Sequence, residues 1–174
     1  MVLRLVGSEM CIRDRTWRLV LHAKIHLAFD ELREDGKLTK ADFRERIDRL
    51  GQVEFDEIHT VLRRENFVRP ETPLDEVYVE FAALYSELRF FAPHCLASYF
   101  PSFEEFSPVD ELLAEDVDID GLFESTRLAG TLNPLEATLD EPDETTDDLD
   151  HLTGHHSEYL SLIHISEPTR RSTI

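Results

Sequence analysis

Apolar residues recur at helical spacing along most of the chain, and strand-like alternation is almost absent. The first such stripe predicts a helix over about residues 16–34, and its members are Trp17, Leu21, Ile25, Ala28 and Leu32. Val20, Leu27 and Phe29 widen the stripe, which predicts a well-buried helix. The helix should end at Gly36, because glycine accepts the left-handed conformation that helix ends favour.

Two further helices are expected between residues 38 and 64. Thr39 and Asp42 stand three apart, as in a capping box, with Asp in place of the usual Glu. Gly51 should interrupt the helical run, because glycine in a helix interior costs about 1 kcal/mol relative to alanine. The apolar stripes before and after it contain Phe43, Ile47 and Leu50, and then Val53, Phe55, Ile58, Val61 and Leu62.

A fourth helix is expected to start at Pro73 and to end before Pro93, with a stripe of Val77, Phe81, Leu84, Leu88 and Phe91. Nine aromatic residues fall between Tyr78 and Phe106. Aromatic side chains bury large areas, so this region should supply the centre of the core.

Ser107 and Pro108 resemble the cap and first turn of another helix, which would carry Val109, Leu112 and Leu113. Apolar residues over 119–123 suggest one or two more turns. The helical pattern stops after Gly130, and residues 140–150 contain seven acidic side chains. The sequence therefore predicts an all-α domain at 16–129, a small bundle of about five helices, followed by a disordered acidic linker at 130–159.

The two ends of the chain are related through their DNA. Residues 5–15 can be encoded by a string whose reverse complement, read in another frame, encodes residues 160–170. These flanks resemble the translated transposon-end adapter of a sequencing library. We therefore expect residues 1–15 and 160–174 to be adapter-derived and leave them out of the fold prediction. Both methionines lie outside residues 16–159, so we expect that remainder to be an internal fragment of a larger multidomain protein.

The formal net charge of −19 is unevenly distributed. Residues 16–69 carry 11 basic and 11 acidic side chains, whereas residues 70–159 carry 2 basic and 23 acidic ones. Such a surface repels phosphate, so we expect no nucleic-acid binding. It would also attract cations, so a basic protein is one candidate for the unknown protein partner. The preferred interpretation is that the acidic residues keep the chain soluble. No apolar run approaches the roughly 20 residues of a membrane span. With Cys95 as the single cysteine of residues 16–159 and no signal segment there, we expect a cytoplasmic location.

One run of residues resembles part of a calcium-binding loop. Asp116, Asp118 and Asp120 occupy the first, third and fifth places of an EF-hand loop, and Gly121 occupies the sixth. The twelfth place, which should hold a bidentate glutamate, holds Arg127. A turn and helix start rich in acidic residues would give the same pattern without calcium.

Histidines supply the other candidate ligands. His22 and His26 stand four apart and would share one helix face, a spacing that suits a transition metal. Asp56 and His59 stand three apart, as the Glu and His do in the Glu-x-x-His motif of di-iron bundles, with Asp in place of Glu. A tract with His151, His155 and His156 lies in the expected linker. Partly buried histidines with ordinary hydrogen bonds are the alternative for the helical pair.

No phosphate-binding glycine loop, nucleophile elbow or other catalytic motif is present, so the sequence indicates no enzyme and no cofactor. Residues 51–58 and 78–85 are similar to regions of large uncharacterised bacterial proteins, a resemblance that implies neither activity nor site. The leading hypothesis is a helical interaction or scaffold module. A degenerate EF-hand-like module that binds divalent cations through Asp116, Asp118 and Asp120 is the alternative, and a metalloenzyme fragment that uses His22 and His26 is a third.

Overall fold

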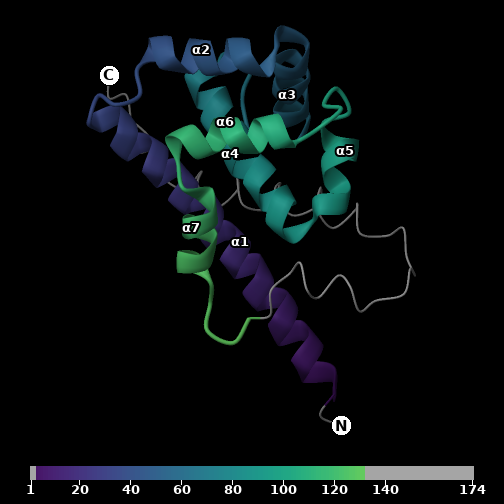
Figure 1. Cartoon of the computed structure of the whole chain (residues 1–174). Coiled ribbons are helices and arrows are strands. Elements are labelled where there is room, and N and C mark those ends of the chain that lie inside the picture. The colour runs from purple at the N-terminus through teal and green to yellow at the C-terminus, as the bar shows by residue number, and fades with distance from the viewer. Residues whose placement is uncertain (1–2, 132–174) are drawn as a thin grey trace, which may run out of the picture. The chain divides into compact units, whose positions relative to one another are not determined.

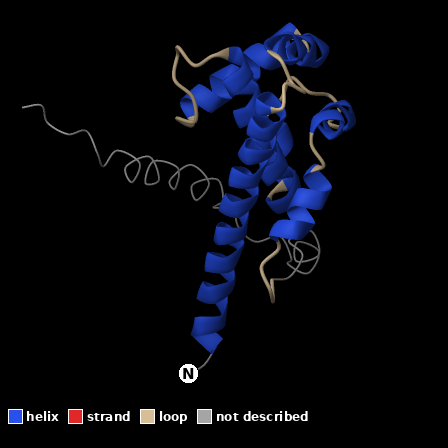
Figure 2. Cartoon of the chain, turned by 90° about the vertical axis from the view of Figure 1, so that its left-hand side faces the viewer, coloured by secondary structure: helices blue, strands red, loops and turns tan. Residues whose placement is uncertain are grey.

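The computed structural model describes residues 3–131, and it describes side chains from Arg15 onward. All of these residues belong to one compact unit, Met1–Glu141. They form helices joined by short turns, and no strand occurs among them (Figure 2). The all-α fold class is thus confirmed for the part of the chain that the structure describes.

The described residues contain seven α-helices and one 3-10 turn, where the sequence predicts about five helices. They are α1 (Leu3–Glu34), α2 (Lys40–Leu50), α3 (Gln52–Arg64), α4 (Leu74–Phe91), η1 (Pro93–Cys95), α5 (Leu96–Tyr99), α6 (Ser107–Asp116) and α7 (Ile119–Thr126). The count differs because α5 is a single turn and α7 has eight residues, both too short for a clear periodic stripe.

Local signals place the first helix boundaries. Gly36 has a φ of 68° and lies just beyond the end of α1. At the start of α2, the backbone N–H of Thr39 donates to the Asp42 carboxylate, and the N–H of Asp42 donates to the Thr39 hydroxyl, which confirms the capping box. Gly51 separates α2 from α3 with a φ of 101°, a conformation that a side chain would strain.

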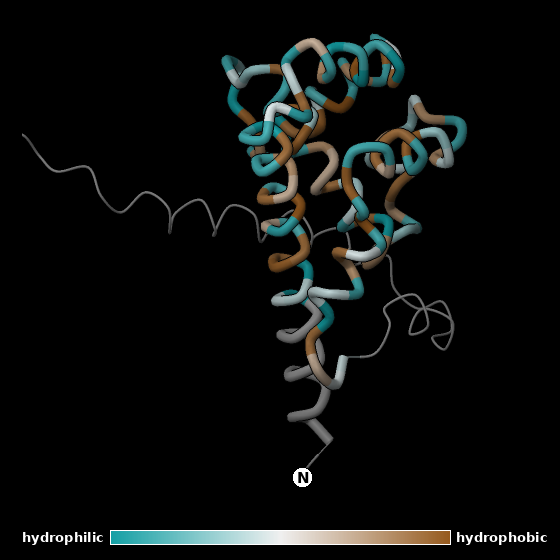
Figure 3. Tube along the Cα trace, turned by 60° about the vertical axis from the view of Figure 1, so that its left-hand side comes forward, coloured by the Kyte–Doolittle hydropathy of each residue, from teal (hydrophilic) through white to brown (hydrophobic). Residues whose placement is uncertain are grey.

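Helix α4 is the centre of the unit. Twelve of its 18 residues are buried, and α1, α2 and α3 all pack against it (Figure 1). It runs antiparallel to α1, because Arg33 near the end of α1 faces Asp75, while Arg18 near the other end faces Glu87. In Figure 3 hydrophobic and hydrophilic residues alternate along the turns of the helices, as expected of helices with one buried side.

Aromatic side chains join the helices at two places. The ring of Phe81 packs edge-on against Phe100 and stacks with Phe103, which ties α4 to the segment after α5. On the other side, Trp17 of α1 stacks on Phe123 of α7, and its indole N–H donates to the hydroxyl of Thr126 over 3.1 Å. The aromatic-rich region therefore supplies the core that the sequence predicts.

Three details of the sequence prediction are wrong. Val53, the first residue of the stripe predicted for α3, is 70 % exposed. Leu27 is 51 % exposed, because α4 and α7 cover the sides of α1 that carry Trp17, Leu21, Ile25 and Phe29 and leave its outer side uncovered. Ser107 is the first residue of α6 and not its cap; Phe106 precedes the helix and makes no side-chain cap hydrogen bond.

The adapter origin of residues 1–15 and 160–174 and the acidic linker at 130–159 stay predictions. Helix α1 begins at Leu3 and continues without a break through residues 15 and 16, so it extends the predicted helix into the residues that resemble adapter. Most of the expected acidic linker at 130–159, and residues 160–174, lie outside the described residues. No described helix combines the length and the apolarity that crossing a bilayer requires.

The buried ring of Phe81 provides a test of the core. Replacing it with alanine should lower the free energy of unfolding by about 3–5 kcal/mol, because the substitution leaves a cavity next to Phe100 and Phe103. Val53→Ala is the matched control: Val53 is 70 % exposed, so its truncation should change stability by less than about 0.5 kcal/mol. Urea denaturation followed by circular dichroism measures both.

The same measurement tests the adapter assignment. Deletion of residues 1–14 leaves Trp17 and the buried stripe of α1 intact, so the loss of stability should be well below that of Phe81→Ala. A loss as large as that of Phe81→Ala would mean that residues 1–14 are native structure.

Candidate metal centre

Three side chains from α1 and α4 converge on one point. The Nε2 atoms of His22 and His26 lie 3.1 Å apart. The two carboxylate oxygens of Glu80 face them: Oε1 lies 3.3 Å from Nε2 of His22, and Oε2 lies 3.2 Å from Nε2 of His26. Among the described residues, these three form the group of His, Cys, Asp and Glu side chains whose ligand atoms lie close enough together to share a metal ion.

The helix pairing explains why they meet. His22 and His26 each follow a fully buried residue of α1, Leu21 and Ile25, so they lie at the flank of the buried stripe. Their spacing of four residues brings both imidazoles to the same side of the helix. Helix α4 passes along this flank and places Glu80 opposite both rings.

A second carboxylate fixes the orientation of His22. Its Nδ1 donates to Oε1 of Glu87 over 2.5 Å, and the other oxygen of Glu87 lies 3.6 Å from the guanidinium of Arg18. The side chain of Glu87 is only 4 % exposed. With the proton of Nδ1 held in this way, Nε2 of His22 is turned toward His26 and Glu80. Metal-ligating histidines commonly have such a carboxylate on the far ring nitrogen.

The charges in this cluster shift two pKa values. Burial would lower the pKa of His22, but hydrogen bonds to Glu80 and Glu87 and the charges of both carboxylates outweigh it and raise the pKa to about 10. Burial would raise the pKa of Glu80, but hydrogen bonds from His22 and His26 and their charges lower it to about 2. In the absence of metal, a proton on His22 and the charge of Arg18 together therefore balance the carboxylates of Glu80 and Glu87.

The geometry also suits a metal ion in place of that proton. A tetrahedral ion with nitrogen ligands at about 2.0–2.1 Å separates its donor atoms by about 3.3 Å. The 3.1 Å between the two Nε2 atoms comes close to this value, and each nitrogen lies 3.2–3.3 Å from a different oxygen of Glu80. With one ligand atom from each residue, the three atoms lie within 4.8 Å of one another. Two imidazoles and one carboxylate form a ligand set that binds zinc and other first-row transition metals.

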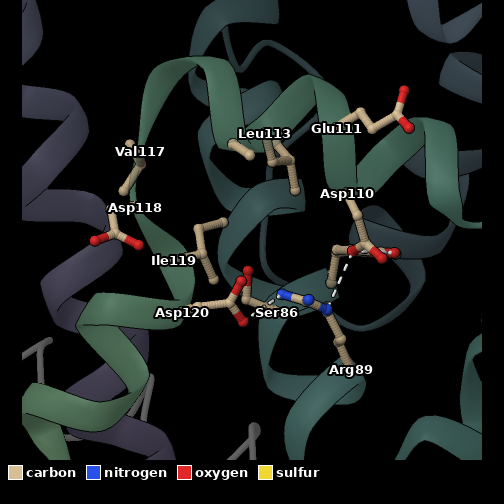
Figure 4. A pocket seen from close by; sticks show the side chains of 11 residues that line it. Ser86, Arg89, Asp110, Glu111, Leu113, Val117, Asp118, Ile119 and Asp120 are labelled. Carbon is tan, nitrogen blue, oxygen red and sulfur yellow. Dashed lines mark hydrogen bonds and ion pairs between the residues drawn. The ribbon is translucent and has the colours of Figure 1, made fainter.

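The three aspartates of the calcium-like motif serve three different partners. The buried carboxylate of Asp116 accepts three hydrogen bonds of 3.0–3.2 Å from the guanidinium of Arg46 on α2. Asp118 caps α7 by accepting from the backbone N–H of Gly121. Asp120 pairs with Arg89 at 3.1 Å and points away from Asp118 (Figure 4). Each carboxylate thus has a structural role, and the three are not brought together.

The remaining histidine candidates lie elsewhere. His59 is on α3, where its Nε2 is buried without a hydrogen-bond partner, and Asp56 accepts a hydrogen bond from Gln52 at the surface. Neither joins the cluster of His22 and His26. The tract with His151, His155 and His156 lies outside the described residues.

The sequence analysis did not find Glu80 and Glu87. The available signal is that these two carboxylates stand seven residues apart, hence on one side of α4, in a helix whose other residues are mostly apolar. Acidic residues on a buried helix need partners, and that requirement could have linked them to the histidines of α1.

The two shifted pKa values predict how metal-free stability depends on pH. The pKa of His22 is raised from 6.5, so the stabilisation from its charge is complete below pH 6.5 and is lost as the pH rises toward 10. The pKa of Glu80 is lowered from 4.5, so its stabilisation is present above pH 4.5 and is lost as the pH falls toward 2. Both contributions to the free energy of unfolding are therefore complete between pH 4.5 and 6.5. Urea denaturation in the presence of a chelator measures this dependence.

Substitution of His22 separates this effect from other titrations. His22→Gln should flatten the decline between pH 6.5 and 10, whereas His94→Gln, at an exposed position, should leave it unchanged. Parallel pH curves for the wild type and His22→Gln would show that the charge cluster does not contribute as described.

Comparison with models of protein families, with curated proteins and with solved structures finds no match to this chain. Its function therefore has to be argued from the chemistry of the cluster formed by His22, His26, Glu80 and Glu87.

Proposed function

We propose that this helical domain binds one divalent transition-metal ion of the zinc class, with His22 Nε2, His26 Nε2 and Glu80 as ligands. The observation that carries the proposal is the convergence of three side chains. The two Nε2 atoms lie 3.1 Å apart, each lies 3.2–3.3 Å from one oxygen of Glu80, and the Glu87 carboxylate binds the far nitrogen of His22. A ligand set alone could arise by chance between two packed helices. A ligand set whose outer carboxylate is also buried and anchored by Arg18 is a more specific arrangement.

The donor atoms favour transition metals over calcium or magnesium. Calcium takes six to eight oxygen ligands, and magnesium keeps several waters around mainly carboxylate sites. Two imidazole nitrogens suit zinc, iron, nickel or copper. Three protein ligands leave at least one position for water or another molecule, as in catalytic rather than structural zinc sites.

A second proposed function, that of an interaction or scaffold module, is favoured by the outer side of α1. Leu19 and Leu27 are 40 % and 51 % exposed, and Ala23 lies between them one turn from each. Single exposed leucines are common, but three apolar residues at a spacing of four form a stripe on one helix. A basic protein in the cytoplasm remains the proposed partner, on the strength of the acidic second half of the chain.

Metal titration tests the first proposal. The full chain should be used with His151, His155 and His156 replaced by glutamine, so that the tract outside the described residues contributes no ligands. Calorimetry should then show one zinc site. Removing a ligand in His26→Gln or Glu80→Gln should weaken zinc binding by more than about 100-fold, since the loss of an outer-sphere partner alone typically costs 10–100-fold.

Two controls accompany this titration. His94→Gln removes an exposed histidine away from the cluster and should leave zinc binding unchanged. Calcium should give no saturable heat, and Asp118→Asn should not alter the zinc result, because Asp118 caps α7. Zinc binding that survives both His26→Gln and Glu80→Gln would overturn the assignment, and saturable calcium binding lost in Asp118→Asn would support the EF-hand-like alternative.

Glu87→Gln tests the role of the outer carboxylate. The charge of Glu87 raises the affinity of His22 for a proton and for a metal alike. Apparent zinc affinity of the wild type should therefore rise with pH until His22 loses its proton, near pH 10. In Glu87→Gln the rise should end at a lower pH, on a plateau about 10–100-fold weaker.

Chelator-buffered titrations over this range measure both curves, and Glu111→Gln, an exposed position on α6, is the matched control. A uniform loss of affinity at every pH would show that Glu87 acts only through the packing of α4.

A further inference from the structure

The metal centre opens onto a hollow at the surface between α1 and the start of α4. The hollow has a volume of about 510 Å³ and is lined by His26 and Glu80 together with side chains that include Arg33, Arg69, Thr72 and Glu76. His22 is not part of its wall. The ring of Phe67 is stacked on that of His22, with 6.2 Å between the ring centroids, and Glu87 binds Nδ1 of His22. Of the three ligands, His26 and Glu80 therefore face the hollow.

Two arginines supply hydrogen-bond donors beside this opening. Nε of Arg33 is buried and has no hydrogen-bond partner. Its Nη atoms lie 3.4 Å from Asp30 and 3.5 Å from Asp75, both at the outer limit of a hydrogen bond. Arg33 lines the hollow and its side chain is 27 % exposed, so a ligand there can bind its Nη atoms in place of these two long contacts.

Arg69 lies in the turn before α4, on the rim of the same hollow. Its backbone N–H donates to the hydroxyl of Thr72 over 2.9 Å, which fixes the turn, while its side chain is exposed. An arginine so placed can reach over the opening. The planar fork of a guanidinium matches the two oxygens of a carboxylate or a phosphate.

The acidic groups of the hollow restrict the charge of a ligand. Asp30 and Glu76 line it as well, and Asp75 faces Arg33. These three carboxylates and Glu80 oppose the two arginines and the double charge of a metal ion. The balance tolerates one added negative charge far better than two, so a carboxylate fits and a phosphate dianion is disfavoured.

We propose that a small carboxylate ligand fills the open coordination position from this hollow, with one oxygen on the metal and its charge held by Arg33 and Arg69. The inference rests on the proposed metal site and adds the class of molecule that this site takes. Val68 and Val79 at the base of the hollow are buried and apolar, so they would contact the carbon body of the ligand.

Cobalt provides the probe, because its visible d–d absorption reports the geometry and the ligands of the ion. The full chain, with His151, His155 and His156 replaced by glutamine, is loaded with Co²⁺ and titrated with acetate, and separately with inorganic phosphate. Acetate should change the absorption in a saturable way and phosphate should bind more weakly. Arg69→Gln and Arg33→Gln should each weaken acetate binding by about tenfold or more, whereas the exposed Arg63→Gln should leave it unchanged.

The outcomes separate this inference from the metal proposal. If Co²⁺ binds and acetate leaves its spectrum unchanged, the carboxylate site is wrong and the metal site stands. Acetate binding that is equally strong in both arginine variants, or phosphate binding that is tighter than acetate binding, also overturns the inference. A chain that gives no d–d bands with Co²⁺ overturns both proposals. Arg69 is exposed, so Arg69→Gln remains informative even if loss of the contact between Arg33 and Phe43 weakens the fold.

Discussion

The antiparallel packing of α1 on α4 is the constraint on which the other features depend. Burial of Trp17, Leu21, Ile25 and Phe29 fixes the rotation of α1, and the apolar surroundings of α4 fix its position against them. Once the positions of both helices are fixed, the side chains at the flank of the contact can reach only the partners opposite them. The ligand cluster is therefore a consequence of the core, and its rigidity comes from residues that carry no chemistry.

The packing of α1 on α4 requires that the charges of Glu80 and Glu87 be neutralised. The side chain of Glu87 is 4 % exposed and that of Glu80 is 16 % exposed, and a carboxylate so far removed from water is costly unless a positive group neutralises it. Arg18 contributes one such charge, and the other must come from a proton on His22 or from a metal ion in the same place. In the proposed metal site the two occupants would compete for one nitrogen lone pair, which would link pH, metal affinity and the stability of the helix pair in a single equilibrium.

The sequence predicted the features that depend on residues close together in the chain. The turn at Gly36, the capping box of Thr39 and Asp42, and the break at Gly51 each involve residues that act on their own neighbours, and all three are confirmed. The histidine pair was visible for the same reason. Glu80 was not, because it meets the histidines across more than fifty residues of chain, and its position depends on how α4 is rotated. The predicted stripe from Val77 to Phe91 covers only part of the buried surface: twelve residues around α4 are buried, so the stripe alone did not fix that rotation. Leu27 was misplaced for a related reason, since an apolar residue does not indicate whether a neighbour covers it.

Competition for carboxylates explains why the acidic motif and the histidine cluster differ. In a chain with 37 acidic residues, oxygen ligands are abundant, so spacing alone gives matches such as Asp116, Asp118 and Asp120. Each of those oxygens is already used, by the Arg46 fork, by a helix N-terminus or by Arg89. A cation would have to displace a charge-assisted partner at each position. Glu80 differs because its partners are imidazoles, whose nitrogens can release a proton and become ligands themselves. Displacing that proton keeps the hydrogen bond between His22 and Glu87 and exchanges the hydrogen bond to Glu80 for a bond from Glu80 to the metal. A metal ion would thus enter the proposed site without taking apart the packing of α1 on α4.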